Sequence, residues 1–167
     1  GLIMISETQY QNFIKNVTES LEKDWVIVGG SLLALIKAST RATSDIDICP
    51  LNDMSNEDRL ALMDLAIKSN LPIEAINPSA DFFLRQIPCW KSSLVLLING
   101  KKGKIYRPSL ELYIQLKLNR ASQIDIEDCI SFIKWHKLEN IAYDSEKIKE
   151  HLNNYSPSLR SKIQSFL

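Results

Sequence analysis

The chain has 167 residues, enough for one domain with its own hydrophobic core and too few for two domains of ordinary size. Its residues are 45% hydrophobic and 24% charged, which is typical of a folded soluble protein and excludes a largely disordered one. Lys plus Arg and Asp plus Glu number 20 each, so no overall charge draws the chain to nucleic acid or to an anionic membrane.

The first predicted elements are a helix, a strand and a second helix. Apolar residues recur at helical spacing over 6–21, and Ser6 is a suitable N-cap. A short β-branched strand follows and is stopped by Gly29-Gly30, after which Ser31 can cap the second helix. We therefore expect a tight glycine turn between a strand and a helix.

The middle of the chain is predicted to contain most of the strands. Polar and apolar residues alternate over 41–49, as in a half-buried strand, and Pro50 ends the run. An amphipathic helix is predicted over 55–69. Three β-like segments follow, the last two joined by a glycine-containing turn that predicts a hairpin: 72–76, 93–98 and 104–106.

Beyond Pro108 the pattern is helical. Four helices are predicted there, at 110–117, 124–135, 144–152 and 157–166. The order of elements predicts an α/β (α+β) domain, in which a mixed sheet is flanked by helices and backed by a C-terminal helical cap. We expect one domain over 1–167, with an α/β core in 1–107 and a helical part in 108–167.

Two aspartates on the predicted 41–49 strand are the leading candidates for a chemical role. Residues two apart on a strand face the same side, so one polar stripe is expected, formed by Arg41, Thr43, Asp45 and Asp47. The Cα atoms of the two aspartates would lie about 7 Å apart, given a rise of ~3.3 Å per residue. Carboxylates at this spacing can share one cation or bridge two cations ~3.5–4 Å apart, as in-line phosphoryl displacement requires. Mg²⁺ is the expected ion because the ligands are oxygens.

The Gly29-Gly30-Ser31 turn supplies a second indication of a site. Backbone N–H groups at a strand-to-helix turn can hold a triphosphate, and the Ser31 hydroxyl would add a donor. Glycine is expected there because a side chain would block the approach of a phosphate. An Asp-x-Asp pair is usually a solvent-facing strand and a Gly-Gly pair usually a structural turn. Their combination is what indicates a site.

These segments resemble the signature of the DNA polymerase β nucleotidyltransferase superfamily. Val26-Ile-Val-Gly-Gly-Ser31 is similar to its glycine turn, and Arg41-Ala-Thr-Ser-Asp-Ile-Asp47 to its Asp-x-Asp strand. Three C-terminal segments resemble small nucleotidyltransferases of the abortive-infection AbiE-toxin type: Arg107-Pro-Ser-Leu-Glu111, Leu116-Lys-Leu118 and Asp125-Ile-Glu-Asp128. The resemblance implies Mg²⁺-dependent transfer of a nucleoside monophosphate from a nucleoside triphosphate (NTP) to an acceptor.

The resemblance also implies roles for single residues. Asp45 and Asp47 would bind metal, in a one-ion or two-ion site. The nucleotide would be bound by Gly29, Gly30, Ser31, Arg41, Thr43 and Lys117. Asp125 and Asp128 would cap a helix and orient Lys117 or Arg120, or else touch substrate.

A third carboxylate is usual in the members of the superfamily that catalyse, where it serves as metal ligand and base. Glu74 is the candidate, since it faces away from Ile73 and Ala75 on the predicted 72–76 strand. The other interpretation is a solvated glutamate, and Asp81 is then the reserve candidate.

The acceptor and the partners stay open at this stage. Between Arg85 and Arg120 the sequence has eight basic residues and one acid, a segment that either guides an RNA backbone or is in part a solvated hairpin tip. A tRNA, a protein or a small molecule would serve as acceptor, and an antitoxin-like protein as partner. The alternative function is a non-catalytic nucleotide-binding or regulatory module of the same fold.

Three remaining features complete the expectations. Trp90 is the aromatic residue expected nearest a nucleobase. Cys49, Cys89 and Cys129 lie far apart, which suits reduced thiols in core positions. No apolar run approaches the ~20 residues that span a bilayer, so we expect a cytoplasmic protein without a membrane partner.

Overall fold

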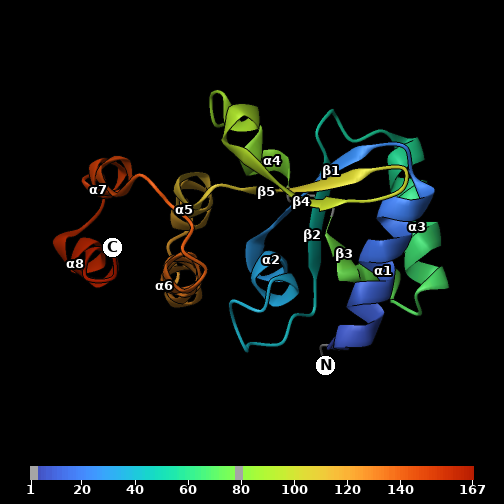
Figure 1. Ribbon diagram of the computed structural model, residues 1–167, viewed down its shortest axis with the longest axis horizontal. Coiled ribbons are helices and arrows are strands. Elements are labelled where there is room, and N and C mark those ends of the chain that lie inside the picture. Colours follow the sequence, from blue (N-terminus) through green and yellow to red (C-terminus); the bar gives the residue numbers. More distant parts are fainter. Residues whose placement is uncertain (1–3, 78–80) are drawn as a thin grey trace.

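A computed structural model of the protein describes residues 4–77 and 81–167 (Figure 1). In this part of the chain five strands form one mixed sheet, in the order β3-β2-β1-β5-β4. The strands are β1 (Asp24–Val28), β2 (Ile46–Pro50), β3 (Ile76–Asn77), β4 (Leu94–Asn99) and β5 (Lys104–Pro108). With helices around this sheet, the predicted α+β fold class is confirmed.

Helices precede, separate and follow the strands. They are α1 (Glu7–Ser20), α2 (Gly29–Leu35), α3 (Asn56–Lys68), α4 (Asp81–Leu84), α5 (Leu110–Leu118), α6 (Gln123–Leu138), α7 (Ser145–Leu152) and α8 (Pro157–Gln164). Two 3₁₀ turns, η1 (Ile73–Ala75) and η3 (Trp90–Ser93), precede β3 and β4. Figure 1 shows α5 to α8 gathered at one end of the molecule and α1 with α3 at the other. Within the described ranges, none of the helices has the length and apolar character needed to cross a membrane.

Serine residues fix where several helices begin. The hydroxyls of Ser6, Ser55 and Ser122 each accept a hydrogen bond from the backbone N–H three residues later. The side chain at that third position bonds back to the serine backbone and so completes a capping box. The predicted starts of α1 and α3 agree with these caps.

Strand β1 is the centre of the sheet, antiparallel to β2 and parallel to β5. Its carboxyl end, Val28, pairs with Asp47, and its amino end, Asp24, pairs with Lys104. Strands β4 and β5 pair antiparallel, as the predicted hairpin requires. The turn of this hairpin therefore lies at the opposite end of β1 from Asp47.

The core lies on both faces of the sheet. Trp25 and Ile27 of β1 face a large cluster that also contains Phe13 of α1 and Phe132 of α6. Val26 and Val28 face a smaller cluster on the other side, which includes residues of α4, η3 and α5. Apolar residues at every one of these positions give β1 the continuous run of a strand buried on two faces. The large cluster contains residues from both 1–107 and 108–167.

Two predicted strands are shorter in the structure than the sequence indicated. Residues 41–45 form a loop in which the Thr43 hydroxyl donates to the Asp45 carbonyl over 2.6 Å, and β2 begins only at Ile46. The predicted polar stripe of four residues therefore does not exist, because only Asp47 of them lies on the strand. Most of the predicted 72–76 strand is the turn η1, which Pro72 starts by accepting a hydrogen bond from the Ala75 N–H.

The turn from β1 into α2 is built around Gly29 and Ser31. Gly29 has a φ of 66°, and a Cβ atom there would collide with the carboxylate of Asp47. Ser31 lies within α2 instead of capping it, and its side chain is fully buried. Its hydroxyl donates to the Val28 carbonyl (2.7 Å) and accepts from the Asp47 N–H (3.0 Å). Ser31 thus joins the turn to β2, and its hydroxyl is not exposed to a ligand as predicted.

Gly29→Ala is expected to destabilise the protein by roughly 2 kcal/mol, because a left-handed backbone disfavours a side chain and the new methyl group displaces Asp47. Gly30→Ala is the matched control, since its Cβ would meet the flexible end of Arg41 at 3.1 Å and, in ordinary contact, Asp128 Oδ2 at 3.8 Å. Urea unfolding of both variants measures the difference. Equal losses of stability would contradict this account of the turn.

Candidate nucleotide-binding site

A cleft of about 620 Å³ opens where β1 ends and α2 begins. Its walls come from the ends of β1, β2 and β3, from α4 and from the last turn of α5. This volume lies within the range of roughly 300–1,000 Å³ that is usual for small-molecule sites. Asp47, Lys117 and Arg120 all line it, so the cleft is the candidate functional site.

Asp47 is a half-buried carboxylate that the fold holds in place. Its Oδ1 accepts a hydrogen bond of 2.6 Å from the Asn77 side chain. Burial raises the pKa of Asp47, while the Asn77 hydrogen bond and the charges of Lys117 and Arg120 oppose the rise. Asp45 is exposed in the loop before β2, and its charge also raises the pKa of Asp47. The charge of Asp45 therefore acts on Asp47, and the two aspartates differ in burial.

The position beside Asp47 on the neighbouring strand holds Asn77 and not a carboxylate. Strands β2 and β3 are parallel, with Asp47 paired to Asn77. The prediction for Glu74 is wrong in this respect, because Glu74 is exposed on η1 and does not line the cleft. The reserve candidate Asp81 is ion-paired to Arg85, with 3.2 Å between Oδ2 and Nε.

The oxygen ligands that the cleft offers a cation are therefore few. Over residues 4–77 and 81–167, no three His, Cys, Asp or Glu side chains are grouped so as to hold a metal ion. Asp47 and Asn77 line the cleft, whereas Asp45 lies in the exposed loop before β2 and is not part of the lining. The two carboxylates and the amide oxygen of Asn77 are all hard ligands that suit Mg²⁺. The orientation of the Asn77 amide follows from its hydrogen bond to Asp47, and a rotated amide would present its oxygen instead.

Helix α5 brings two cations to the cleft. The Tyr113 hydroxyl donates to the Gly29 carbonyl over 3.0 Å and fixes the helix against the glycine turn. Lys117 follows one helical turn later, and Arg120 lies in the turn just after α5 ends at Leu118. Tyr113, Lys117 and Arg120 all line the cleft. The Lys117 side chain is 12% exposed and that of Arg120 is 76% exposed. Lys117 is thus held in place, while Arg120 extends into solvent.

Two buried aspartates of α6 orient these cations. Asp125 forms two hydrogen bonds to Arg120, of 3.0 and 3.1 Å, and lies 3.5 Å from the Lys117 Nζ. Burial opposes its ionisation, but the hydrogen bonds from Arg120 and Ser122 hold the pKa of Asp125 at about 2. Asp128 lies 2.7 Å from the Lys117 Nζ. Both carboxylates are 1% exposed, so the acidic partner in each of these ion pairs is shielded from solvent.

Arg41 joins the same network from the other side. Its guanidinium lies 2.6 Å from Asp128, and its side chain is 40% exposed. The guanidinium also lies next to Gly30, where a Cβ atom would be 3.1 Å from it. The loop that carries Thr43 and Asp45 is therefore tied to α6 and not to a strand.

The charges that line the cleft cancel. Asp47 and Asp125 contribute two negative charges, and Lys117 and Arg120 contribute two positive ones. A triphosphate brought to this surface would meet no net attraction from the lining side chains. A bound divalent cation would supply the missing positive charge.

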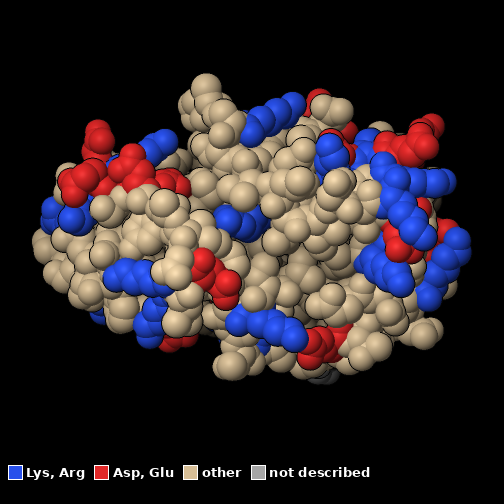
Figure 2. All heavy atoms as spheres, in the orientation of Figure 1, with Lys and Arg blue, Asp and Glu red and all other residues tan. Residues whose placement is uncertain are grey.

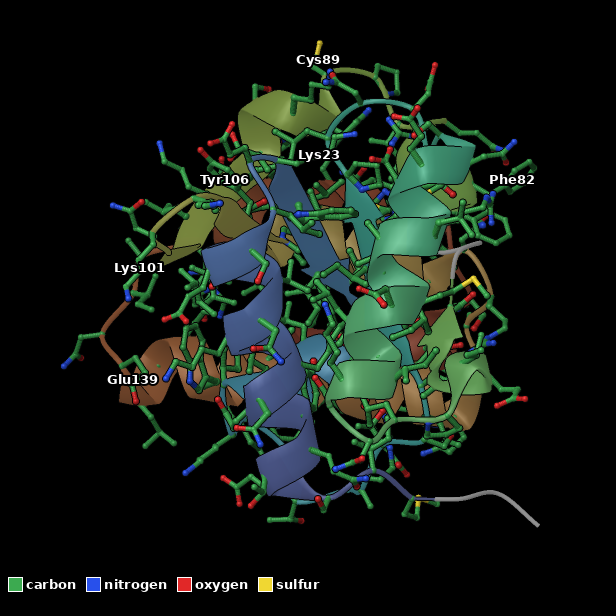
Figure 3. All side chains as sticks on the ribbon, turned by 90° about the vertical axis from the view of Figure 1, so that its right-hand side faces the viewer. Lys23, Phe82, Cys89, Lys101, Tyr106 and Glu139 are labelled. Carbon is green, nitrogen blue, oxygen red and sulfur yellow. The ribbon has the colours of Figure 1, made fainter. Side chains whose placement is uncertain are left out.

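The basic residues of the segment 85–120 do not form one surface. Lys101 and Lys102 line a second hollow of about 610 Å³ with Lys23 and Lys91, at the amino end of β1. Figure 2 shows Lys and Arg side chains gathered at that end of the molecule, and Figure 3 shows Lys23 and Lys101 there. Arg107 is buried and donates to the Pro108 carbonyl. Of the basic residues in this described segment, only Lys117 and Arg120 line the cleft.

The aromatic residues at the cleft differ from the one expected. Trp90 is 8% exposed, packs in the smaller core cluster and does not line the cleft. Phe83 and Tyr113 line it instead. The only sequence signal for Tyr113 is its spacing one helical turn before Lys117. For Asn77 the signal is a polar side chain directly after Ile76, and for Phe83 no pattern in the sequence separates it from Phe82.

Comparison with known proteins identifies a family. A family model described as "Nucleotidyltransferase of unknown function (DUF6036)" matches residues 6–163. Neither a curated protein nor a solved structure matches the chain. The match includes every residue of the cleft and the ion-pair network.

Asp47→Asn is expected to raise the melting temperature of the free protein at pH 7 by roughly 2 °C, as the removal of a half-buried charge at a functional site commonly does. Because the pKa of Asp47 is raised in the folded state, its ionisation costs stability as pH rises through that pKa. The difference between variant and wild type should therefore vanish below the unfolded pKa of about 3.9. Thermal melts between pH 3 and pH 7 measure it, and a variant less stable than wild type at pH 7 would refute the argument.

Proposed function

The chain belongs to this family of nucleotidyltransferases, and we propose that it binds an NTP with Mg²⁺ in the cleft and transfers a nucleoside monophosphate to an acceptor hydroxyl. One observation carries the proposal. The turn at Gly29 places the Asp47 carboxylate in the same cleft as Lys117 and Arg120. A carboxylate that binds a cation and side chains that bind phosphate are thereby brought together.

Each part of the site has a role in the proposed reaction. Asp45 and Asp47 hold the cation, with the Asn77 amide beside them. Mg²⁺ would neutralise the phosphate charge that the balanced cleft cannot. Lys117, which Asp125 and Asp128 hold in place, binds phosphate, and the exposed Arg120, which Asp125 orients, contacts the leaving pyrophosphate. The backbone of Gly29 and Gly30 contacts the phosphates.

The acceptor would meet the cleft from its open side. In the proposed transfer the acceptor oxygen bonds to the α-phosphorus, the bond from this phosphorus to the bridging oxygen breaks, and pyrophosphate leaves. An RNA acceptor would be contacted by Arg120, because the hairpin lysines lie at the far end of β1.

On the C-terminal helices the large apolar residues that are exposed are Ile124 and Leu138, at opposite ends of α6. The described exposed residues therefore offer no single apolar face there for an antitoxin-like partner.

Thermal stabilisation by NTP tests the proposal directly. Each of the four NTPs with Mg²⁺ is expected to raise the melting temperature. At an NTP concentration of 100 times the dissociation constant, binding adds about 2.7 kcal/mol to the free energy of unfolding. The shift should be lost without Mg²⁺ and in an Asp45→Asn, Asp47→Asn variant. Glu74→Gln is the matched control, because Glu74 is exposed outside the cleft and its loss should leave the shift unchanged. No shift with any nucleotide would refute the proposed function.

A second function is favoured by the identity of Asn77. Removal of the proton from an attacking hydroxyl needs a base, and an amide cannot accept it at neutral pH. With Asn77 beside Asp47 and Glu74 outside the cleft, the same fold serves as a nucleotide-binding module without transfer chemistry. Nucleotide binding is common to both proposals, and turnover separates them.

Asn77→Asp is expected to tighten Mg²⁺ binding about tenfold, because it adds a carboxylate next to the one at Asp47. The same change should lower the stability of the metal-free protein through repulsion between the two carboxylates. Calorimetry with Mg²⁺ and thermal melts in EDTA measure the two effects. Unchanged Mg²⁺ affinity would show that the cation does not reach this position.

A further inference from the structure

Helix α4 exposes two adjacent phenylalanines at the edge of the cleft. The side chain of Phe82 is 60% exposed and that of Phe83 is 49% exposed, and their rings meet edge to face with 5.1 Å between centroids. Phe83 lines the cleft, whereas Phe82 does not. Figure 3 shows Phe82 at the periphery of the molecule. A half-exposed ring at the rim of a polar cleft is a feature that the fold itself does not require.

The backbone of α4 is anchored directly after these two rings. Leu84 is fully buried in the smaller core cluster with Val28. The Arg85 guanidinium donates to the carbonyls of Pro50 (2.7 Å) and Leu51 (3.2 Å) at the end of β2. Phe83 is therefore held at a fixed place relative to the sheet, which lowers the entropy lost when a ligand packs on it.

The cleft is lined by both charged and apolar side chains. Asp47, Lys117 and Arg120 supply charge, and Val28, Leu116 and Phe83 supply apolar surface. A ligand that matches both kinds of lining carries charge and also a flat, weakly polar group. We propose that Phe83 is the nucleobase-stacking residue of the cleft, a proposal that rests on the NTP binding proposed above.

Stacking on one ring sets the expected selectivity. Every nucleobase has a π-face, so an aromatic platform binds all of them, with preferences that follow stacking strength. Purine nucleotides should bind more tightly than pyrimidine nucleotides because their ring systems are larger. The nucleobase adds to affinity, while the charged side chains of the cleft bind the triphosphate together with Mg²⁺.

The test compares ATP with inorganic triphosphate, both with Mg²⁺, by calorimetry on the full chain. Phe83→Ala is expected to weaken ATP binding about tenfold, within the range measured when stacking aromatics are replaced by alanine. Binding of inorganic triphosphate should change less than twofold. Phe82→Ala is the matched control, since it removes a neighbouring ring that is more exposed and lies outside the cleft, and it should leave both affinities unchanged.

Two further variants separate stacking from bulk. Phe83→Tyr keeps the flat ring and should retain ATP affinity, whereas Phe83→Leu keeps apolar volume and should lose it. If Phe83→Ala weakens ATP and triphosphate equally, or neither, the stacking role is refuted while the proposed NTP site stands. If the wild type binds neither ligand, the proposed function itself fails. Equal losses of ATP affinity in Phe82→Ala and Phe83→Ala would refute the assignment of the stacking role to Phe83.

Discussion

The half-buried charge of Asp47 is the constraint around which the rest of the structure is organised. Gly29 leaves room for the carboxylate, Ser31 holds its backbone N–H, and Asn77 donates to its side chain. Burial nevertheless raises the pKa of Asp47, so these contacts do not fully replace the water that the carboxylate loses. Such a charge marks Asp47 as a candidate functional residue, because perturbed pKa values cluster at functional sites.

The C-terminal helices complete this position by supplying charge of the opposite sign. Lys117 and Arg120 would repel each other and any cation if they stood alone in the cleft. Asp125 and Asp128, buried in α6, neutralise them and fix their directions. The helical part is thus a portion of the site, which explains why the hydrophobic core runs without a break from α1 through the sheet to α6.

Local sequence patterns were sufficient for the fold class, the glycine turn and the hairpin. Capping serines and periodic apolar residues act over a few positions, so their structural result is visible in the sequence. The place of Asn77 was not predictable in this way, because it depends on pairing between β2 and a strand of two residues that begins after an unpredicted turn. Alternation of strand faces alone favours Glu74 as the third carboxylate. Pro72 breaks that alternation because it starts η1. The family match covers both Glu74 and Asn77. The partners of Asp47 come from long-range packing, which local patterns in one sequence do not encode.

The start of β2 at Ile46 separates Asp45 from Asp47 in conformational freedom. Asp47 lies within a hydrogen-bonded strand. Its backbone N–H donates to the Ser31 hydroxyl, and its Oδ1 accepts from the Asn77 side chain. Asp45 lies one residue before the strand, in a loop that Arg41 ties to α6 at its other end. If a cation bridged the two carboxylates, the Asp45 loop would lose conformational entropy on binding, whereas the Asp47 side chain would lose almost none. Movement of α6 would act on that ordering through Arg41, so the distant helices can influence how tightly an ion is held without touching it.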